Sequence, residues 1–219
     1  MRLSHRHEFV FLATPRTAST SVRDALDDYS DIKSVYKTQI TSEFPFYHHI
    51  SASELKMIFE QNGWDWSKYQ TACFVRNPFD RVVSLFHHHI EKSQRTAPGK
   101  SVVYNSLRKI KYKYLISKKF GDFVKSLDSN SRLQSPVIDF VTDSNGKILV
   151  DDILRFEELS DSFVNWTSKI NISEAGDSLM KLNSSKARND YRSYYTDELV
   201  EVVRRFYKKD IEAFGYKFE

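Results

Sequence analysis

Short apolar runs alternate with polar loops and amphipathic stretches along the first half of the chain. Residues 8–13 (EFVFLA) and 70–75 (QTACFV) are rich in β-branched and aromatic side chains, as buried strands are, and residues 32–36 predict another strand. A polar loop and then apolar residues at helical spacing follow these runs. The recurrence of strand, loop and helix predicts an α/β fold with a parallel sheet flanked by helices.

Capping residues and proline mark where the helices begin. Ser19 or Thr20 is the expected N-cap of the first helix, and residues 51–54 (SASE) combine cap residues with a following apolar face. Pro78 opens a third helix, since proline is favoured in the first helical turn. Two of these helices therefore start directly after the loop that ends a strand.

The second half of the chain is less regular. Residues 93–130 are basic and polar, and we expect an insertion or mobile cover there. Residues 143–146 (DSNG) predict a hairpin-type turn between two β-rich segments, the second of which runs over 148–156. A final helix is expected over residues 197–214, ending at Gly215.

Length and charge narrow the class of protein. The 219 residues fit one domain over the whole chain, and 33 basic against 29 acidic residues leave a charge of +4. This small excess is typical of a solvated mixed-charge surface, so we expect no nucleic-acid partner. Cys73 is the one cysteine, which excludes an intrachain disulfide. We see no signal-peptide core and no stretch of membrane-spanning length, so a cytoplasmic location is expected.

The first candidate site is residues 14–21 (TPRTASTS), where a strand passes into a helix. Backbone amides and the helix dipole favour anions at such a position, and the hydroxyls and Arg16 add further donors. The segment has no glycine, which disfavours a Walker loop of the form GxxxxGK[ST]. A Ser/Thr-rich cap and turn explains the same residues equally well.

The second candidate site begins at Arg76, at the end of the run 70–75. Ser84 follows about two helical turns later, in the helix that Pro78 opens. At the carboxyl edge of a parallel sheet, Arg76 is able to grip a phosphate bidentately while Ser84 donates a hydrogen bond. The alternative is a surface arginine and a buried helix serine.

Together the two segments resemble the PAPS-dependent sulfotransferases, where PAPS is 3′-phosphoadenosine 5′-phosphosulfate. The likeness is strongest to the carbohydrate and heparan-type enzymes, whose loops read like PKTGSTS and VRNPxDRxVS. Residues 155–159 (RFEEL) are similar to the family's RFExL segment, and residues 182–216 follow its closing pattern of tyrosines and a final helix. The resemblance covers nearly the whole chain except residues 93–130.

The resemblance implies a P-loop-NTPase-like sulfotransferase fold with PAPS as donor. It implies that the first loop holds the 5′-phosphosulfate, and that Arg76 and Ser84 hold the 3′-phosphate. Ser185 and Lys186 are implied to touch the nucleotide. The implied first-loop residues are Pro15, Arg16, Thr17, Ala18, Ser19, Thr20 and Ser21.

Catalysis is expected from Arg16 and His49. Arg16 stands where the family usually has lysine, and Ala18 where glycine is common. Arginine has a pKa above about 12, so we expect Arg16 to stabilise charge on the leaving phosphate rather than donate a proton. His49 is the expected base, because related enzymes have a histidine in a similar place. His48 is the alternative base, and a capping or packing pair is a further one.

We expect that no metal is required, because arginines and backbone amides already supply positive charge at the site. The consecutive residues His87–His89 point about 100° apart on a helix and do not converge as metal ligands. The predicted activity is transfer of a sulfonate to a hydroxyl or amine of an acceptor. The acceptor is a small molecule or a glycan, and a carbohydrate is the expected class. A noncatalytic nucleotide- or glycan-binding module and an atypical P-loop kinase are the alternatives. The sequence leaves the acceptor's identity and the oligomeric state unknown.

Overall fold

The described residues form two compact units. The structure is a computed structural model that describes residues 1–95, 119–128, 131–182 and 190–219. The first unit comprises Met1–Arg76 and Pro136–Ala187, and the second comprises Asn77–Ser135 and Arg188–Glu219. The expectation of one domain over residues 1–219 stays a prediction.

A five-stranded sheet forms the centre of the first unit, in the order β3-β1-β2-β4-β5. The strands are β1 (Arg2–Ser4), β2 (Phe9–Leu12), β3 (Ile32–Lys33), β4 (Gln70–Val75) and β5 (Asp152–Arg155). Strands β2, β4 and β5 are parallel, whereas β1 pairs antiparallel with both β2 and β3. The predicted parallel sheet is therefore correct for three strands, and the sheet as a whole is mixed.

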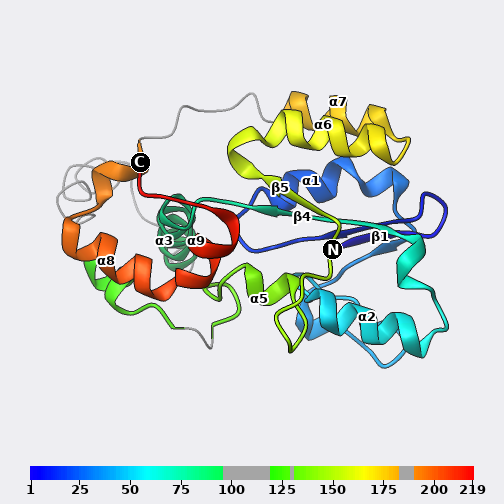
Figure 1. Cartoon of the computed structure of the whole chain (residues 1–219), viewed down its shortest axis with the longest axis horizontal. Coiled ribbons are helices and arrows are strands. Elements are labelled where there is room, and N and C mark those ends of the chain that lie inside the picture. The colour runs from blue at the N-terminus through cyan, green and yellow to red at the C-terminus, as the bar shows by residue number, and fades with distance from the viewer. Residues whose placement is uncertain (96–118, 129–130, 183–189) are drawn as a thin grey trace. The chain divides into compact units, whose positions relative to one another are not determined.

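The helices of the first unit cover both faces of its sheet. They are α1 (Ser19–Ala25), α2 (Ala52–Gln61), α5 (Ile138–Val141), α6 (Leu159–Lys169) and α7 (Ser173–Leu182). Helices α1, α6 and α7 lie on one face, and α2 and α5 on the other (Figure 1). Phe9, Phe11 and Phe74 of the sheet pack with Phe163 and Trp166 of α6 in a buried core.

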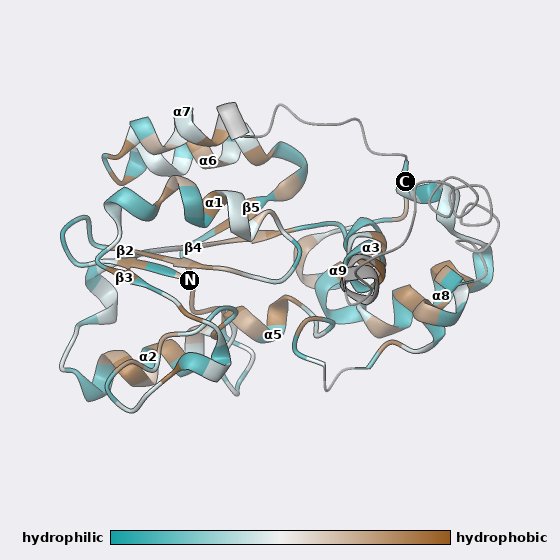
Figure 2. Ribbon diagram, turned by 180° about the vertical axis from the view of Figure 1, so that it is seen from behind, coloured by the Kyte–Doolittle hydropathy of each residue, from teal (hydrophilic) through white to brown (hydrophobic). Residues whose placement is uncertain are grey.

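Local sequence explains why α2 begins where it does. Ser51 is its N-cap and forms a capping box with Glu54, as the SASE pattern predicts. Leu55 and Phe59 are fully buried. Figure 2 shows the resulting alternation of hydrophobic and hydrophilic positions along α2. Helix α2 is thus amphipathic and packs through one side.

Several expected β segments differ from the structure. The strand expected at 32–36 is confined to β3 (Ile32–Lys33). The strand expected at 148–156 is confined to β5, and the turn at 143–146 follows the short helix α5 rather than a strand. The turn itself is present, because Gly146 has a φ of 80° and Thr142 bridges to Ile148. The hairpin-type turn is therefore confirmed without the first of its two strands.

The second unit is helical in its described residues. It contains α3 (Pro78–Arg95), a helical segment at 119–125, α8 (Asp197–Phe206) and α9 (Lys208–Phe214). The helix expected over residues 197–214 is interrupted at Tyr207, whose φ of −102° and ψ of 26° leave the helical region. Gly215 ends α9 with a φ of 67°, as predicted.

The described part of the basic segment 93–130 contributes to the second unit's core. Phe120 and Val124 are fully buried there and pack with residues of α3 and α8. Residues 96–118 and 129–130, and with them most of the segment's lysines, lie outside the described residues. The insertion or mobile cover stays a prediction.

Arg81 connects several segments of the second unit. Its side chain is fully buried and donates hydrogen bonds to the backbone oxygens of Leu133 and Ser135. It also forms an ion pair with the buried carboxylate of Asp210, at 3.8 Å, and lies over the ring of Tyr207. Burial raises the pKa of Tyr207 to about 12, so the phenol is protonated and donates to the oxygen of Gln134.

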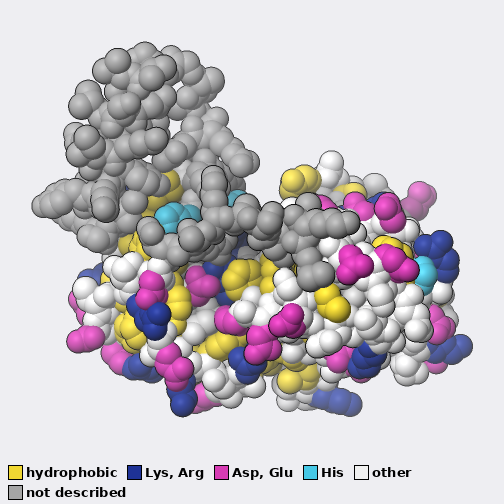
Figure 3. Space-filling model, turned by 90° about the horizontal axis from the view of Figure 1, so that it is seen from above, with side chains coloured by type: hydrophobic (Ala, Val, Ile, Leu, Met, Phe, Trp, Pro, Cys, Tyr) yellow, Lys and Arg dark blue, Asp and Glu magenta, His cyan; other side chains and the backbone are white. Residues whose placement is uncertain are grey.

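The described surface carries charges of both signs. On the face in Figure 3, acidic and basic side chains are interspersed among polar and apolar ones. Among the described residues, no helix combines the length and the apolar character needed to cross a membrane.

Candidate functional site

The loop between β2 and α1 is built on two residues with left-handed backbone conformations. Arg16 has a φ of 66° and Ala18 a φ of 60°, in a segment without glycine. Both are half-buried. Thr14 and Pro15, which precede them, and Thr17, which separates them, are buried. A left-handed conformation costs a residue with a Cβ about 1 to 2 kcal/mol. The fold therefore holds this loop in a strained shape, which is common at binding sites.

Buried hydroxyls fix the loop from the inside. Thr17 donates to the backbone oxygen of Thr14, and Thr14 donates to the oxygen of Phe74 on β4. The hydroxyl of Thr17 thus forms a hydrogen bond within the protein, whereas the family resemblance implies that Thr17 contacts the 5′-phosphosulfate. Thr20, by contrast, is exposed on the first turn of α1.

The N-terminus of α1 differs from the sequence prediction by one residue. Ala18 is the N-cap, and Ser19 is the first helical residue rather than a cap. Because alanine has no side-chain oxygen, no side-chain hydrogen bond caps the first turn. The expected cap at Ser19 or Thr20 is wrong. The physical reason is the left-handed conformation of Ala18, which turns the chain into the helix earlier.

Arg76 lies at the end of β4 and contacts the loop directly. Strands β2 and β4 are parallel neighbours, so their carboxyl ends lie at the same edge of the sheet. The Nη1 atom of Arg76 donates to the backbone oxygen of Arg16 at 3.2 Å. The structure therefore brings together the loop and the arginine that the sequence proposed as paired phosphate sites.

An aromatic ring orients Arg76. The guanidinium lies 4.1 Å from the ring centroid of Phe156, and the whole residue is only 3% exposed. Phe156 follows β5, the other parallel neighbour of β4, directly. Sequence reasoning missed this role. The available signal was an aromatic residue immediately after a strand that ends at the same sheet edge.

The other predicted donor contacts lie in the second unit or outside the described residues. Ser84 is buried on α3 in the second unit, with 6% exposure. Ser185 and Lys186 lie outside the described residues. Their expected roles stay predictions.

His49 is held beside the start of the loop. Its Nδ1 atom lies 2.6 Å from the backbone oxygen of Ala13, the residue before Thr14. A carbonyl oxygen only accepts hydrogen bonds, so Nδ1 carries a proton, and in the neutral ring the lone pair is on Nε2. The backbone of His49 also has a positive φ, of 61°, which residues other than glycine rarely adopt. The fold thus fixes both the position and the tautomer of this imidazole.

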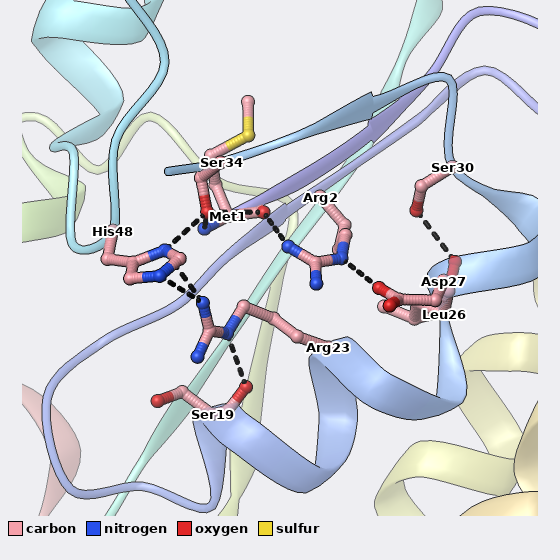
Figure 4. A network of polar contacts seen from close by, with 9 residues as sticks. All are labelled: Met1, Arg2, Ser19, Arg23, Leu26, Asp27, Ser30, Ser34 and His48. Atoms are coloured by element: carbon pink, nitrogen blue, oxygen red, sulfur yellow. Dashed lines mark hydrogen bonds and ion pairs between the residues drawn. The ribbon is translucent and has the colours of Figure 1, made fainter. Parts of the chain in front are cut away.

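His48 belongs to a different network, drawn in Figure 4. Its Nδ1 lies 2.7 Å from the Oγ of Ser34, whose own proton is donated to the oxygen of Met1. The Nη1 of Arg23 lies 2.7 Å from the same Nδ1 and 3.1 Å from Nε2, so its guanidinium contacts the ring edge between the two nitrogens. Both nitrogens of this ring have structural partners.

The surroundings of His48 disfavour its charged form. Burial, then Arg23, the N-terminal amine, His49 and Arg2 lower its pKa from 6.5 to about 4. Burial is the largest of these causes and the nearby cations add to it. His48 is consequently neutral at physiological pH.

The three consecutive histidines of α3 show no metal site. His87 contacts the hydroxyl of Tyr194 at 2.9 Å. Within the described residues, no group of three or more His, Cys, Asp or Glu side chains is arranged to hold a metal ion. The expectation that no metal is required stays a prediction.

One comparison with known proteins gives a match. A family model described as the sulfotransferase family matches residues 1–217, nearly the whole chain. The curated proteins and the solved structures give no match. The match covers the loop after β2, Arg76 and both histidines.

Proposed function

The chain belongs to the sulfotransferase family, and from this premise we propose that it transfers a sulfonate from PAPS to a hydroxyl or amine of a carbohydrate acceptor. The family assigns sulfonate transfer in general; the donor and the acceptor class are our proposal. One observation carries it. Arg76 at the end of β4 bonds to the carbonyl of Arg16, so the two candidate anion-binding elements meet at one sheet edge. The cytoplasmic location expected from the sequence stays a prediction.

The loop has properties that suit a phosphosulfate. Successive amides around left-handed residues form concave anion sites, and Arg16 and Ala18 both adopt this conformation. The uncapped first turn of α1 adds the positive end of a helix dipole. In the proposal, residues 15–21 hold the 5′-phosphosulfate and Arg76 holds the 3′-phosphate. Ser84, Ser185 and Lys186 complete the donor contacts, as the resemblance predicts.

His49 is the proposed general base. The donor supplies a sulfonate that is already activated by its bond to phosphate. The Nε2 of His49 takes the proton of the acceptor hydroxyl or amine as the acceptor oxygen or nitrogen bonds to sulfur. The carbonyl of Ala13 holds Nδ1–H, and it stabilises the imidazolium that results. His48 does not fill this role in the proposal, because both of its nitrogens have structural partners.

Arg16 stabilises the charge that remains on the phosphate when the sulfur–oxygen bond breaks. A fixed cation aimed at developing charge is usually among the largest catalytic contributions. The guanidinium keeps its proton throughout, so the phosphate leaves as an anion.

Ligand binding tests the donor assignment. The ligand is 3′-phosphoadenosine 5′-phosphate (PAP), added at about 100 times its Kd. It should raise the free energy of unfolding by about 2.7 kcal/mol, which corresponds to roughly 5 to 10 °C in Tm. ATP with Mg²⁺ should give a smaller shift. A larger shift with ATP would favour a kinase and contradict the proposal.

Arg76→Gln tests the 3′-phosphate contact. It should weaken PAP binding more than adenosine 5′-phosphate binding, which lacks the contacted group. Arg6→Gln is the matched control, because Arg6 is an exposed arginine at the opposite end of β2. Equal weakening of both nucleotides by Arg76→Gln would remove the 3′-phosphate role.

Turnover tests the catalytic assignment. Sulfur-labelled PAPS is incubated with glycan, phenol and amine acceptors, and products are detected by mass spectrometry. With an acceptor in hand, His49→Asn should lower kcat by about 10² to 10⁴ and Arg16→Ala by about 10² to 10³. His48→Asn should cost less than about tenfold. PAP binding without transfer to any acceptor would instead support the noncatalytic binding module.

A further inference from the structure

Arg23 is a half-buried cation whose protein partners are neutral. Its Nε donates to the backbone oxygen of Ser19 at 3.1 Å, and its Nη1 contacts the ring of His48 (Figure 4). In the described part of the chain, no carboxylate lies within ion-pair distance of its guanidinium. Arg2 differs in this respect, because it forms an ion pair with Asp27.

The partner of Arg23 does not offset its charge. His48 is neutral, since burial and the neighbouring cations lower its pKa to about 4. Burial and the nearby Arg2 also lower the pKa of Arg23 itself, and the smaller opposing effects of Asp24, Asp27 and Tyr36 offset this only in part. Taking a charge partly out of water without a counterion is unfavourable. The field around this guanidinium therefore favours the arrival of an anion.

The charge lies next to the proposed catalytic base. His48 and His49 are adjacent in the chain, and His49 bonds to Ala13 at the start of the loop. The ring of Tyr36 makes an edge contact with His48 at 4.9 Å and is 67% exposed. An exposed aromatic ring and a cation thus both contact His48, the chain neighbour of the proposed base.

We propose that Arg23 binds an anionic group of the acceptor, a carboxylate or a sulfate, close to the hydroxyl or amine that His49 deprotonates. A planar guanidinium matches both groups, because two parallel N–H donors meet two oxygens. Tyr36 forms an apolar wall for the acceptor. This inference rests on the proposed function and adds a residue that selects among acceptors.

Three probes that differ in one substituent test the inference. They are methyl glucuronide with a carboxylate, methyl glucoside 6-sulfate, and neutral methyl glucoside. Their Kd values are measured by NMR titration of the PAP-saturated protein. At least one charged probe should bind about 10- to 100-fold more tightly than the neutral one, as expected for charge-assisted hydrogen bonds. The two charged arms identify which anion is read.

Arg23→Gln should reduce this preference to less than about threefold, whereas Arg6→Gln, with the same change in charge, should leave it intact. Arg23→Lys keeps the charge without the fork, so it should retain part of the preference. Tyr36→Leu should weaken all three probes by a similar factor. Retention of PAP binding in each variant shows that the unit is folded.

Two outcomes overturn the inference. One is equal binding of charged and neutral probes to the wild-type protein, and the other is a preference that survives Arg23→Gln. Failure of the proposed function is a separate result, because it appears as absence of PAP binding before any acceptor probe is added. A protein that binds PAP but ignores acceptor charge refutes only the Arg23 subsite.

Discussion

Acid should destabilise the fold through His48. In the folded chain its pKa is about 4, against an ordinary value of 6.5. Between these values the unfolded chain binds a proton that the folded chain excludes. The free energy of unfolding therefore falls as the pH drops from about 6.5 to about 4, and this contribution is fully present only above 6.5.

The size of the effect follows from the difference between the two pKa values. At 1.36 kcal/mol per pH unit the difference corresponds to about 3.4 kcal/mol. The ring is only half-buried, so solvent screening reduces this to about 1 to 2 kcal/mol. His48→Asn removes the titrating group while its amide keeps a donor near Ser34.

Urea unfolding at a series of pH values between 4 and 7.5 measures this contribution. The wild-type protein should lose about 1 to 2 kcal/mol more than His48→Asn over that range. An NMR titration of the imidazole gives the pKa directly. Parallel stability curves for the two proteins, or a His48 pKa near 6.5, would refute the reasoning.

Two further substitutions test the loop and the second unit. Ala18→Gly should raise the free energy of unfolding by about 0.5 to 1 kcal/mol, because relief of the left-handed conformation exceeds the entropic cost of glycine; a less stable variant in urea would contradict the strain. Asp210→Leu should cost about 3 to 5 kcal/mol, since it removes a carboxylate that pairs with the buried charge of Arg81. The double variant Arg81→Met/Asp210→Leu should recover part of this loss by the same measurement, and a purely additive loss would show that packing rather than charge is decisive.

The central strands were predictable because their signal is local. Residues 70–75 form β4 with the predicted bounds, since a continuous apolar run needs only burial on both faces. Strand β1 was missed because Arg2 and Ser4 are polar. Both are nevertheless buried, and their partners Asp27 and Asp31 lie about 25 residues away. Burial of polar residues through distant partners leaves no periodic pattern to detect.

The candidate site was predictable in its location and less so in its detail. The strand ends indicated the loop and Arg76, and the structure brings them into contact. The conformation of Ala18 carried no signal, because glycine rather than alanine marks a positive φ. Adjacent histidines are chemically alike, so only their partners, Ala13 for His49 and Arg23 for His48, distinguish them.

The contact between Arg76 and the loop has a consequence for donor binding. The guanidinium that is proposed to bind the 3′-phosphate also fixes the carbonyl of Arg16, the residue proposed to stabilise the leaving 5′-phosphate. A shift of Arg76 toward one phosphate therefore changes the backbone that holds the other. Because this hydrogen bond joins the protein groups proposed to bind the two ends of the donor, binding of the two phosphates should be cooperative rather than additive. Loss of Arg76 should then weaken even adenosine 5′-phosphate somewhat, and the 3′-phosphate contribution is the additional loss seen with PAP.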